Sequence, residues 1–192
     1  MSRSIKSVAV FCGSNFGNSE AFAKGARQLG EELAKAGITL VYGGTTKGLM
    51  GVVADALMAA GGTAHGVITE SLHGRGHAHP RLSRSEIVAT LRGRKERMAD
   101  LADAFIAMPG GIGTMEEMME VWTMNQLGEI DKPVGLLNIN GFYAPFLGFI
   151  DHMVESKFLP PAHRHSICVD PEPAALIDKL QKFQKTDVPK WL

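Results

Sequence analysis

A short apolar run, a glycine turn and a helical pattern follow one another three times in this chain. The apolar runs lie at residues 5–12, 38–42 and 104–108, and each has the length of a buried strand. Repeated units of strand and helix predict a parallel sheet with helices on both faces. Since the carboxyl ends of parallel strands meet at one edge of the sheet, we expect the three glycine turns to form a ligand site there.

The remaining elements continue this alternation. Apolar residues at helical spacing predict helices at residues 19–36, 49–60, 91–102, 142–155 and 172–183, and further short apolar runs predict strands at 63–68, 86–90, 133–137 and 166–169. No linker or low-complexity tract interrupts the 192 residues. We therefore expect a single α/β domain with a three-layer, Rossmann-like, doubly wound parallel sheet.

Residues 69–85 show no such periodicity and are rich in histidine and arginine. A loop of this length inside a compact domain is usually functional or mobile, and we expect a lid over a phosphorylated ligand. His73, His77 and His79 could suggest a metal. Because no carboxylate cluster accompanies them on this irregular Gly/Pro loop, we do not expect a metal site.

The composition narrows the choice of partners. The 20 basic residues balance the 20 acidic ones, so no broad basic field is present to hold nucleic acid. The apolar run near the N-terminus is too short for a signal peptide or a membrane span, so a cytoplasmic protein without a membrane partner is expected. Cys12 and Cys168 lie far apart in the sequence and are expected to be reduced, buried thiols.

The junction after the strand at residues 104–108 is suited to an anion. Gly110, Gly111 and Gly113 allow positive φ and a close approach of a ligand to the backbone. Thr114 is a suitable N-cap, and Glu117 stands at the spacing of a capping box. The unpaired N–H groups and the dipole at the start of the following helix favour a phosphate. We predict a phosphate site here.

The glycine turns do not match the familiar nucleotide fingerprints. None of them has the G-x-G-x-x-G spacing of a dinucleotide site. A Walker loop needs Gly-Lys-Ser/Thr, whereas Lys47 precedes Gly48. Nicotinamide-dependent redox chemistry and P-loop ATPase activity are therefore disfavoured. A nucleoside monophosphate or a sugar phosphate fits better, because one phosphate needs only one helix N-terminus.

Residues 109–117, PGGIGTMEE, resemble the PGGxGTxxE signature of the Lonely Guy family of cytokinin riboside 5'-monophosphate phosphoribohydrolases, many of which were long labelled possible lysine decarboxylases. The similarity extends over nearly the whole chain. Matching segments lie at residues 10–14, 42–44, 48–51, 66–68, 94–98, 126–128 and 132–138.

The resemblance implies hydrolysis of the N-glycosidic bond of adenosine 5'-monophosphate, whose base can carry an isoprenoid group on its exocyclic nitrogen. The products would be the free base and ribose 5-phosphate, with no cofactor. The family pattern places the catalytic arginine at Arg94 and the catalytic glutamate at Glu117. It also implies a homodimer with the sites close to the subunit interface.

Residue chemistry gives Glu117 a role of its own. Positive charge builds on the anomeric carbon when a glycosidic bond breaks, so a carboxylate one helical turn beyond the phosphate would stabilise it or orient the attacking water. Glu120 follows on the same helix face, whereas Glu116 should point away. Arg94 would neutralise the phosphate or contact the purine. The residues predicted to bind the substrate are Ser14, Gly43, Gly44, Lys95, Met98, Gly110, Gly111, Gly113, Thr114 and Glu120.

Other interpretations stay open at this point. Glu117 could be only a capping residue, and Arg94 only a solvated helix residue. A carrier that binds a nucleotide or phosphorylated cofactor without reaction would use the same phosphate site. Lysine decarboxylation would need a Schiff-base lysine for pyridoxal phosphate, and the sequence singles out none. Thr45, Thr69 and Ile112 depart from the family pattern, which leaves the preferred base open between plain and modified adenine.

Overall fold

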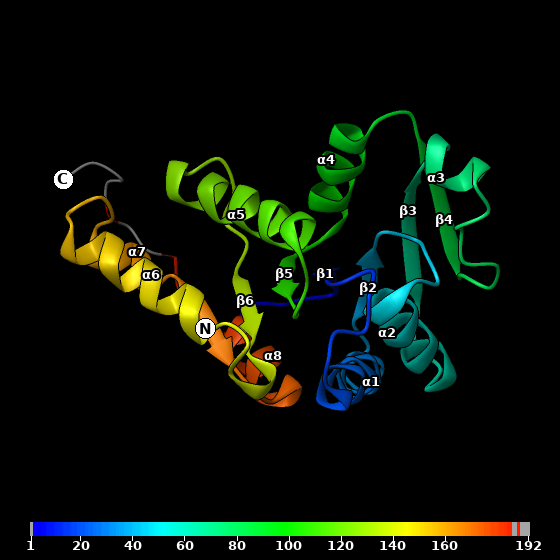
Figure 1. Ribbon diagram of the computed structural model, residues 1–192, viewed down its shortest axis with the longest axis horizontal. Coiled ribbons are helices and arrows are strands. Elements are labelled where there is room, and N and C mark those ends of the chain that lie inside the picture. The colour runs from blue at the N-terminus through cyan, green and yellow to red at the C-terminus, as the bar shows by residue number, and fades with distance from the viewer. Residues whose placement is uncertain (1, 186–187, 189–192) are drawn as a thin grey trace.

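Seven parallel strands form one sheet in the order β4-β3-β2-β1-β5-β6-β7 (Figure 1). The computed structural model describes residues 2–185 and Val188. The strands are β1 (Ser7–Phe11), β2 (Thr39–Tyr42), β3 (Ala64–Thr69), β4 (Arg84–Val88), β5 (Ala104–Ala107), β6 (Val134–Leu137) and β7 (Ile167–Asp170). From β1 the chain first adds β2, β3 and β4 on one side and then returns to add β5, β6 and β7 on the other, so the strand order reverses at β1. This confirms the predicted doubly wound parallel sheet.

Helices cover both faces of the sheet and complete the three layers. The longer ones are α1 (Glu20–Lys35), α2 (Gly48–Ala59), α4 (Leu91–Leu101), α5 (Ile112–Leu127), α6 (Ala144–Glu155) and α8 (Pro173–Lys182). In Figure 1, α1 and α2 lie below the sheet and α4 and α5 above it. The core is divided accordingly, since α1, α2 and α8 pack into one apolar cluster and α4, α5 and α6 into the other.

The central position of β1 in the sheet explains why this strand is apolar from Val8 to Phe11. Val8 and Val10 belong to the core cluster under α1 and α2, and Ala9 and Phe11 to the cluster under α4 and α5. Side chains alternate between the two faces of a strand, so a strand covered on both sides has no polar face. The continuous apolar runs of the sequence therefore predicted the buried strands correctly.

Local signals in the sequence set the ends of several helices. The Ser19 hydroxyl caps α1 by accepting a hydrogen bond from the N–H of Ala21, and Thr90 caps α4 through the N–H of Gly93. Gly37 has φ +66° just beyond α1, and Gly128 has φ 74° at the end of α5. Glycine adopts this left-handed conformation without a steric penalty, and it is the usual residue after a helix.

The predicted loop at residues 69–85 is partly regular. It contains the short helix α3 (Glu70–Gly74), and β4 begins at Arg84 rather than at Glu86. Between them, the N–H of His79 donates to the carbonyl of Gly44 at 2.8 Å. The segment is therefore tied to the turn after β2. Its hydrophilic sequence concealed these elements, because β4 is an edge strand and buries little apolar surface.

Smaller differences occur toward the C-terminus. The 3-10 turn η1 (Ile139–Gly141) precedes α6, which starts two residues later than predicted, and the short helix α7 (Pro161–Arg164) lies between the predicted helix at residues 142–155 and the predicted strand at 166–169. Proline in the first turn is compatible with both helices. The predicted surface tail, residues 185–192, lies outside the described residues except for Lys185 and Val188.

Two further expectations can be compared with the described residues. None of their helices has both the length and the apolar composition needed to cross a membrane. Both cysteines are free thiols, as predicted. Cys12 is buried, but Cys168 is only half-buried, because it lies on the edge strand β7.

Candidate active site

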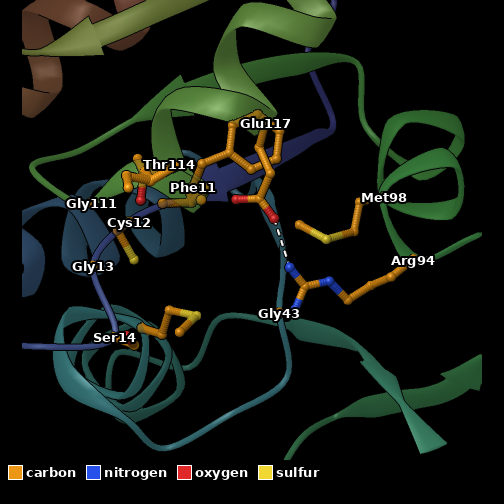
Figure 2. A pocket seen from close by; sticks show the side chains of 14 residues that line it. Phe11, Cys12, Gly13, Ser14, Gly43, Arg94, Met98, Gly111, Thr114 and Glu117 are labelled. Atoms are coloured by element: carbon orange, nitrogen blue, oxygen red, sulfur yellow. Dashed lines mark hydrogen bonds and ion pairs between the residues drawn. The ribbon is translucent and has the colours of Figure 1, made fainter. Parts of the chain in front are cut away.

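The three glycine turns meet at the carboxyl edge of the sheet, as predicted, and surround a cavity of about 270 Å³, here called the front cavity (Figure 2). Residues 12–14 after β1, Gly43 after β2 and residues 111–114 at the start of α5 line it. Its volume is near the lower end of the range for small-molecule sites, about 300 Å³. The strand order reverses at this point, which is where open α/β sheets bind ligands.

The junction between β5 and α5 differs from its prediction. The helix starts at Ile112 with Gly111 at the N-cap, and Thr114 is the third helical residue, so the predicted capping box is wrong. None of the three glycines has a positive φ. Close packing requires Gly110 instead, because a Cβ there would lie 2.1 Å from Thr114 Oγ1 and 2.9 Å from the nitrogen of Gly13.

The start of α5 nevertheless presents free donors to the front cavity. The first bond of the helix runs from the N–H of Met115 to the carbonyl of Gly111, so the three preceding N–H groups have no acceptor within the helix. A Cβ added at Gly111 or Gly113 would meet nothing within 4 Å. This open space and the helix dipole together suit a phosphate group.

An ion pair crosses the opposite side of the front cavity. Arg94 Nη2 on α4 lies 2.7 Å from Glu117 Oε1 on α5, and the two side chains are only 14% and 12% exposed (Figure 2). Arg94 Nε is also buried and has no hydrogen-bond partner among the described residues. Glu117 therefore does not cap its helix, and the Arg94 side chain is not solvent-exposed. Both of the purely structural roles that the sequence left open for these residues are excluded.

Burial perturbs the protonation of Glu117. Removal from water raises the pKa of its carboxyl group above the usual 4.5, and the neighbouring Arg94 opposes that rise only in part. A carboxyl group with a raised pKa beside a fixed cation is a common feature of active sites. The front cavity thus combines an anion-binding end with an acid–base group.

Four of the predicted substrate-binding residues do not line the front cavity. Lys95 on α4 bonds Glu116 and lies 3.0 Å from Glu120. Glu120 does not join Glu117 at the front cavity, because its carboxylate lies beside Lys95 of the neighbouring helix. Glu116, which also contacts this lysine, does not line the front cavity, as predicted. Gly44 packs against β3, and Gly110 lines a smaller cavity beside Phe16, Phe22 and Phe142.

The structure brings the other predicted residues together. Ser14, Gly43, Met98, Gly111, Gly113 and Thr114 line the front cavity with Arg94 and Glu117. Sequence reasoning missed the apolar part of the lining, which consists of Val10, Phe11, Cys12, Met50 and Ile112. Phe11 and Cys12 stand at the carboxyl end of a predicted strand, and this position could have indicated that they line the ligand cavity. Burial raises the pKa of the Cys12 thiol, which makes it a poor nucleophile.

Known proteins resemble this chain in sequence. A family model described as possible lysine decarboxylase matches residues 50–180. A probable cytokinin riboside 5'-monophosphate phosphoribohydrolase of Oryza sativa subsp. japonica is 45% identical over 93% of this chain and 73% of its own length. The cytokinin riboside 5'-monophosphate phosphoribohydrolase LOG1 of Arabidopsis thaliana is 44% identical over 93% of this chain and 84% of its own length. The chain belongs to the Lonely Guy family.

Solved structures of more distant proteins share the fold of this family member. The molybdenum cofactor binding protein of Rippkaea orientalis has a TM-score of 0.69 and 20% identity, covering 94% of this chain and 98% of that one. The Moco carrier protein of Chlamydomonas reinhardtii gives the same score and identity over 92% of this chain and 95% of its own. At such identity the likeness concerns the fold alone.

The Arg94–Glu117 pair makes a prediction about stability. Arg94→Met should lower the free energy of unfolding by about 3 kcal/mol near pH 8, because Glu117 is left as an unpaired buried charge. Loss of the arginine also raises the Glu117 pKa further. A raised pKa penalises the folded state where the pH exceeds the pKa of the unfolded chain, and the penalty is complete only above the raised value, so the loss should shrink as the pH is lowered from 8 to 5. Urea unfolding at both pH values measures this.

The control for this experiment is Arg92→Met on the same helix. Arg92 forms an exposed pair with Glu96 at 2.9 Å, so its removal should change stability by less than about 0.5 kcal/mol at either pH. An Arg94→Met loss that stays constant between the two pH values would contradict the assignment of the effect to Glu117.

Proposed function

We propose that this protein hydrolyses the N-glycosidic bond of adenosine 5'-monophosphate, or of its N6-modified relatives, to the free base and ribose 5-phosphate. The observation that carries the proposal is the position of the buried Arg94–Glu117 pair. It lies across one cavity from the free N–H groups at the start of α5. Membership of the phosphoribohydrolase family supports the same reaction.

The phosphate end of the nucleotide belongs at the helix N-terminus. Backbone N–H groups at Gly113 and Thr114 would donate to the phosphate oxygens, and the lack of side chains at Gly111 and Gly113 leaves room for them. Fixing this dianion positions the distant sugar. The binding energy of the phosphate would therefore raise the rate of bond cleavage as well as the affinity.

Glu117 follows one helical turn further along α5 and would face the ribose. As the C–N bond breaks, its electron pair leaves with the purine and positive charge develops at the anomeric carbon. The ionised carboxylate stabilises that charge and accepts a proton from the attacking water, whose oxygen bonds to the anomeric carbon. The departing purine takes up a proton, so the water is divided between the two products.

Arg94 holds Glu117 ionised and in place before the substrate arrives. Its guanidinium has donors beyond the one that bonds Glu117, and the buried Nε has no hydrogen-bond partner among the described residues. The donors that reach the front cavity would contact the purine nitrogens as negative charge builds on the base, or neutralise the phosphate dianion. The arginine would thus serve both the resting pair and the leaving group.

Two other functions receive less support. The family description as a possible lysine decarboxylase would require a lysine for pyridoxal phosphate, and no described residue that lines the front cavity is a lysine. A non-catalytic carrier is suggested by the cofactor carriers of the same fold, whose likeness is one of fold alone. A carrier has no need of a buried carboxylate paired with arginine beside its ligand.

We further propose that the protein is a cytoplasmic homodimer with the site near the subunit interface. Two large apolar side chains on the helices that carry the site stay exposed: Ile112, which lines the front cavity, is 90% exposed, and Leu91 at the start of α4 is 56% exposed. A second subunit would cover them. Two free thiols agree with a reducing compartment. Sedimentation velocity at micromolar concentration should give about twice the chain mass of 20.6 kDa, and a monomer would contradict the dimer.

The reaction itself is tested by a comparison of substrates. Adenosine 5'-monophosphate should release adenine, and adenosine should react with a kcat/KM at least about 100-fold lower and with a reduced kcat, because it lacks the anchoring phosphate. Chromatography of the products measures both, and an isopentenyl-modified nucleotide reports the preference for the base. Equal cleavage of nucleotide and nucleoside would contradict the mechanism, whereas binding without any release of adenine would favour the carrier.

The role of Glu117 is tested by Glu117→Gln. The amide keeps the shape and can still accept a bond from Arg94, but it cannot take a proton, so kcat should fall by about 10²–10⁴ while nucleotide binding and the melting temperature are retained. Glu129→Gln, an exposed change just beyond the other end of α5, is the control and should leave kcat unaltered. An active Glu117→Gln enzyme would rule out this role.

A further inference from the structure

A second cavity reaches the same carboxylate from another side. It has a volume of about 110 Å³, lies between α4 and α5, and is here called the back cavity. Phe11 and Glu117 line both cavities, so these two side chains form the wall between them. Four charged residues occur in the rest of its lining: Lys95, Glu96, Asp100 and Glu120.

The proposed reaction requires a water molecule at Glu117 while the nucleotide is bound. The front cavity is small, about 270 Å³, so a nucleotide seated in it would cover the side of Glu117 that faces it. A site for one water needs only about 10–15 Å³ and a few polar partners. The back cavity has room for several water molecules. Most of its lining is apolar, but the charged groups among its lining residues supply the polar partners that water needs there.

We propose that the back cavity is the water site and entry route for the hydrolytic reaction, delivering water to Glu117 from between α4 and α5. This inference rests on the proposed function. The delivered water gives its oxygen to the anomeric carbon and one proton to the Glu117 carboxylate. The C–N electron pair leaves with the purine, which takes up the proton and restores the carboxylate.

Lys95 and Glu120 were predicted from the sequence to bind the substrate, and we assign them a different role. They do not reach the front cavity, but they line the back cavity and are joined to each other at 3.0 Å. Glu116 binds the same ammonium group, so the lysine links α4 to α5. These contacts fix the spacing of the two helices and with it the width of the route. Bonds to both carboxylates raise the pKa of Lys95, which keeps it charged.

The route can be blocked without touching the nucleotide site. Ala99 on α4 and Met124 on α5 line the back cavity but not the front one. Ala99→Leu should fill the space and lower kcat for adenosine 5'-monophosphate at least tenfold, with KM within twofold of the parent protein. Met124→Phe fills the same space from the other helix and should act alike. Ala175→Leu, the same change at an exposed position of α8, is the matched control.

Two accompanying measurements separate blockage from damage. The melting temperature reports the fold, and the inhibition constant of ribose 5-phosphate reports the front cavity; both should stay at the parent value. The proposal is overturned if either filled variant keeps its fold and its inhibition constant and also keeps its kcat, or if Ala175→Leu loses kcat to the same extent. If the unaltered protein releases no adenine, it is the proposed function that fails.

Discussion

The buried ion pair between Arg94 and Glu117 is the interaction on which the site depends. It joins two helices that the chain places on the same face of the sheet, and it holds a carboxylate at the wall of a cavity. A pair of charges removed from water gains little net stability over apolar packing. We therefore interpret the pair as a functional feature. Arg94 orients the Glu117 carboxyl group and opposes the rise in its pKa that burial causes.

Helix α4 illustrates how the fold accommodates this pair. Met98 is the only fully buried residue of α4, and Arg94 is largely buried, so hydrophobic packing contributes little to the position of this helix. Charged contacts take over that role: Lys95 binds the carboxylates of α5, and Arg97 makes two bonds of 2.7 and 2.9 Å to Glu86 on β4. The helix that carries Arg94 is thus located by directional contacts. These leave space between α4 and α5 that an apolar interface would have closed.

The sequence predicted the sheet and the common location of the three turns, because alternation along β1 and the glycines after each strand are local signals. It failed where packing between distant segments decides. Thr114 lies inside α5, and Gly110 just before the helix packs closely against Gly13. Rules for helix caps use local sequence only and cannot predict such a contact between distant segments. Glu120 turns to Lys95, a residue of another helix. The Arg94–Glu117 contact joins positions 23 residues apart, so no local pattern indicated it. The family resemblance singled out both residues but not their contact.

The proposed reaction depends most on the orientation of the nucleotide in the front cavity, and one crystal structure tests that orientation directly. Crystals of Glu117→Gln grown with adenosine 5'-monophosphate should show the phosphate within about 3 Å of the N–H groups at the start of α5. The side chain at position 117 should face the anomeric carbon of the ribose. A nucleotide bound elsewhere, or one whose sugar lies away from position 117, would contradict the account.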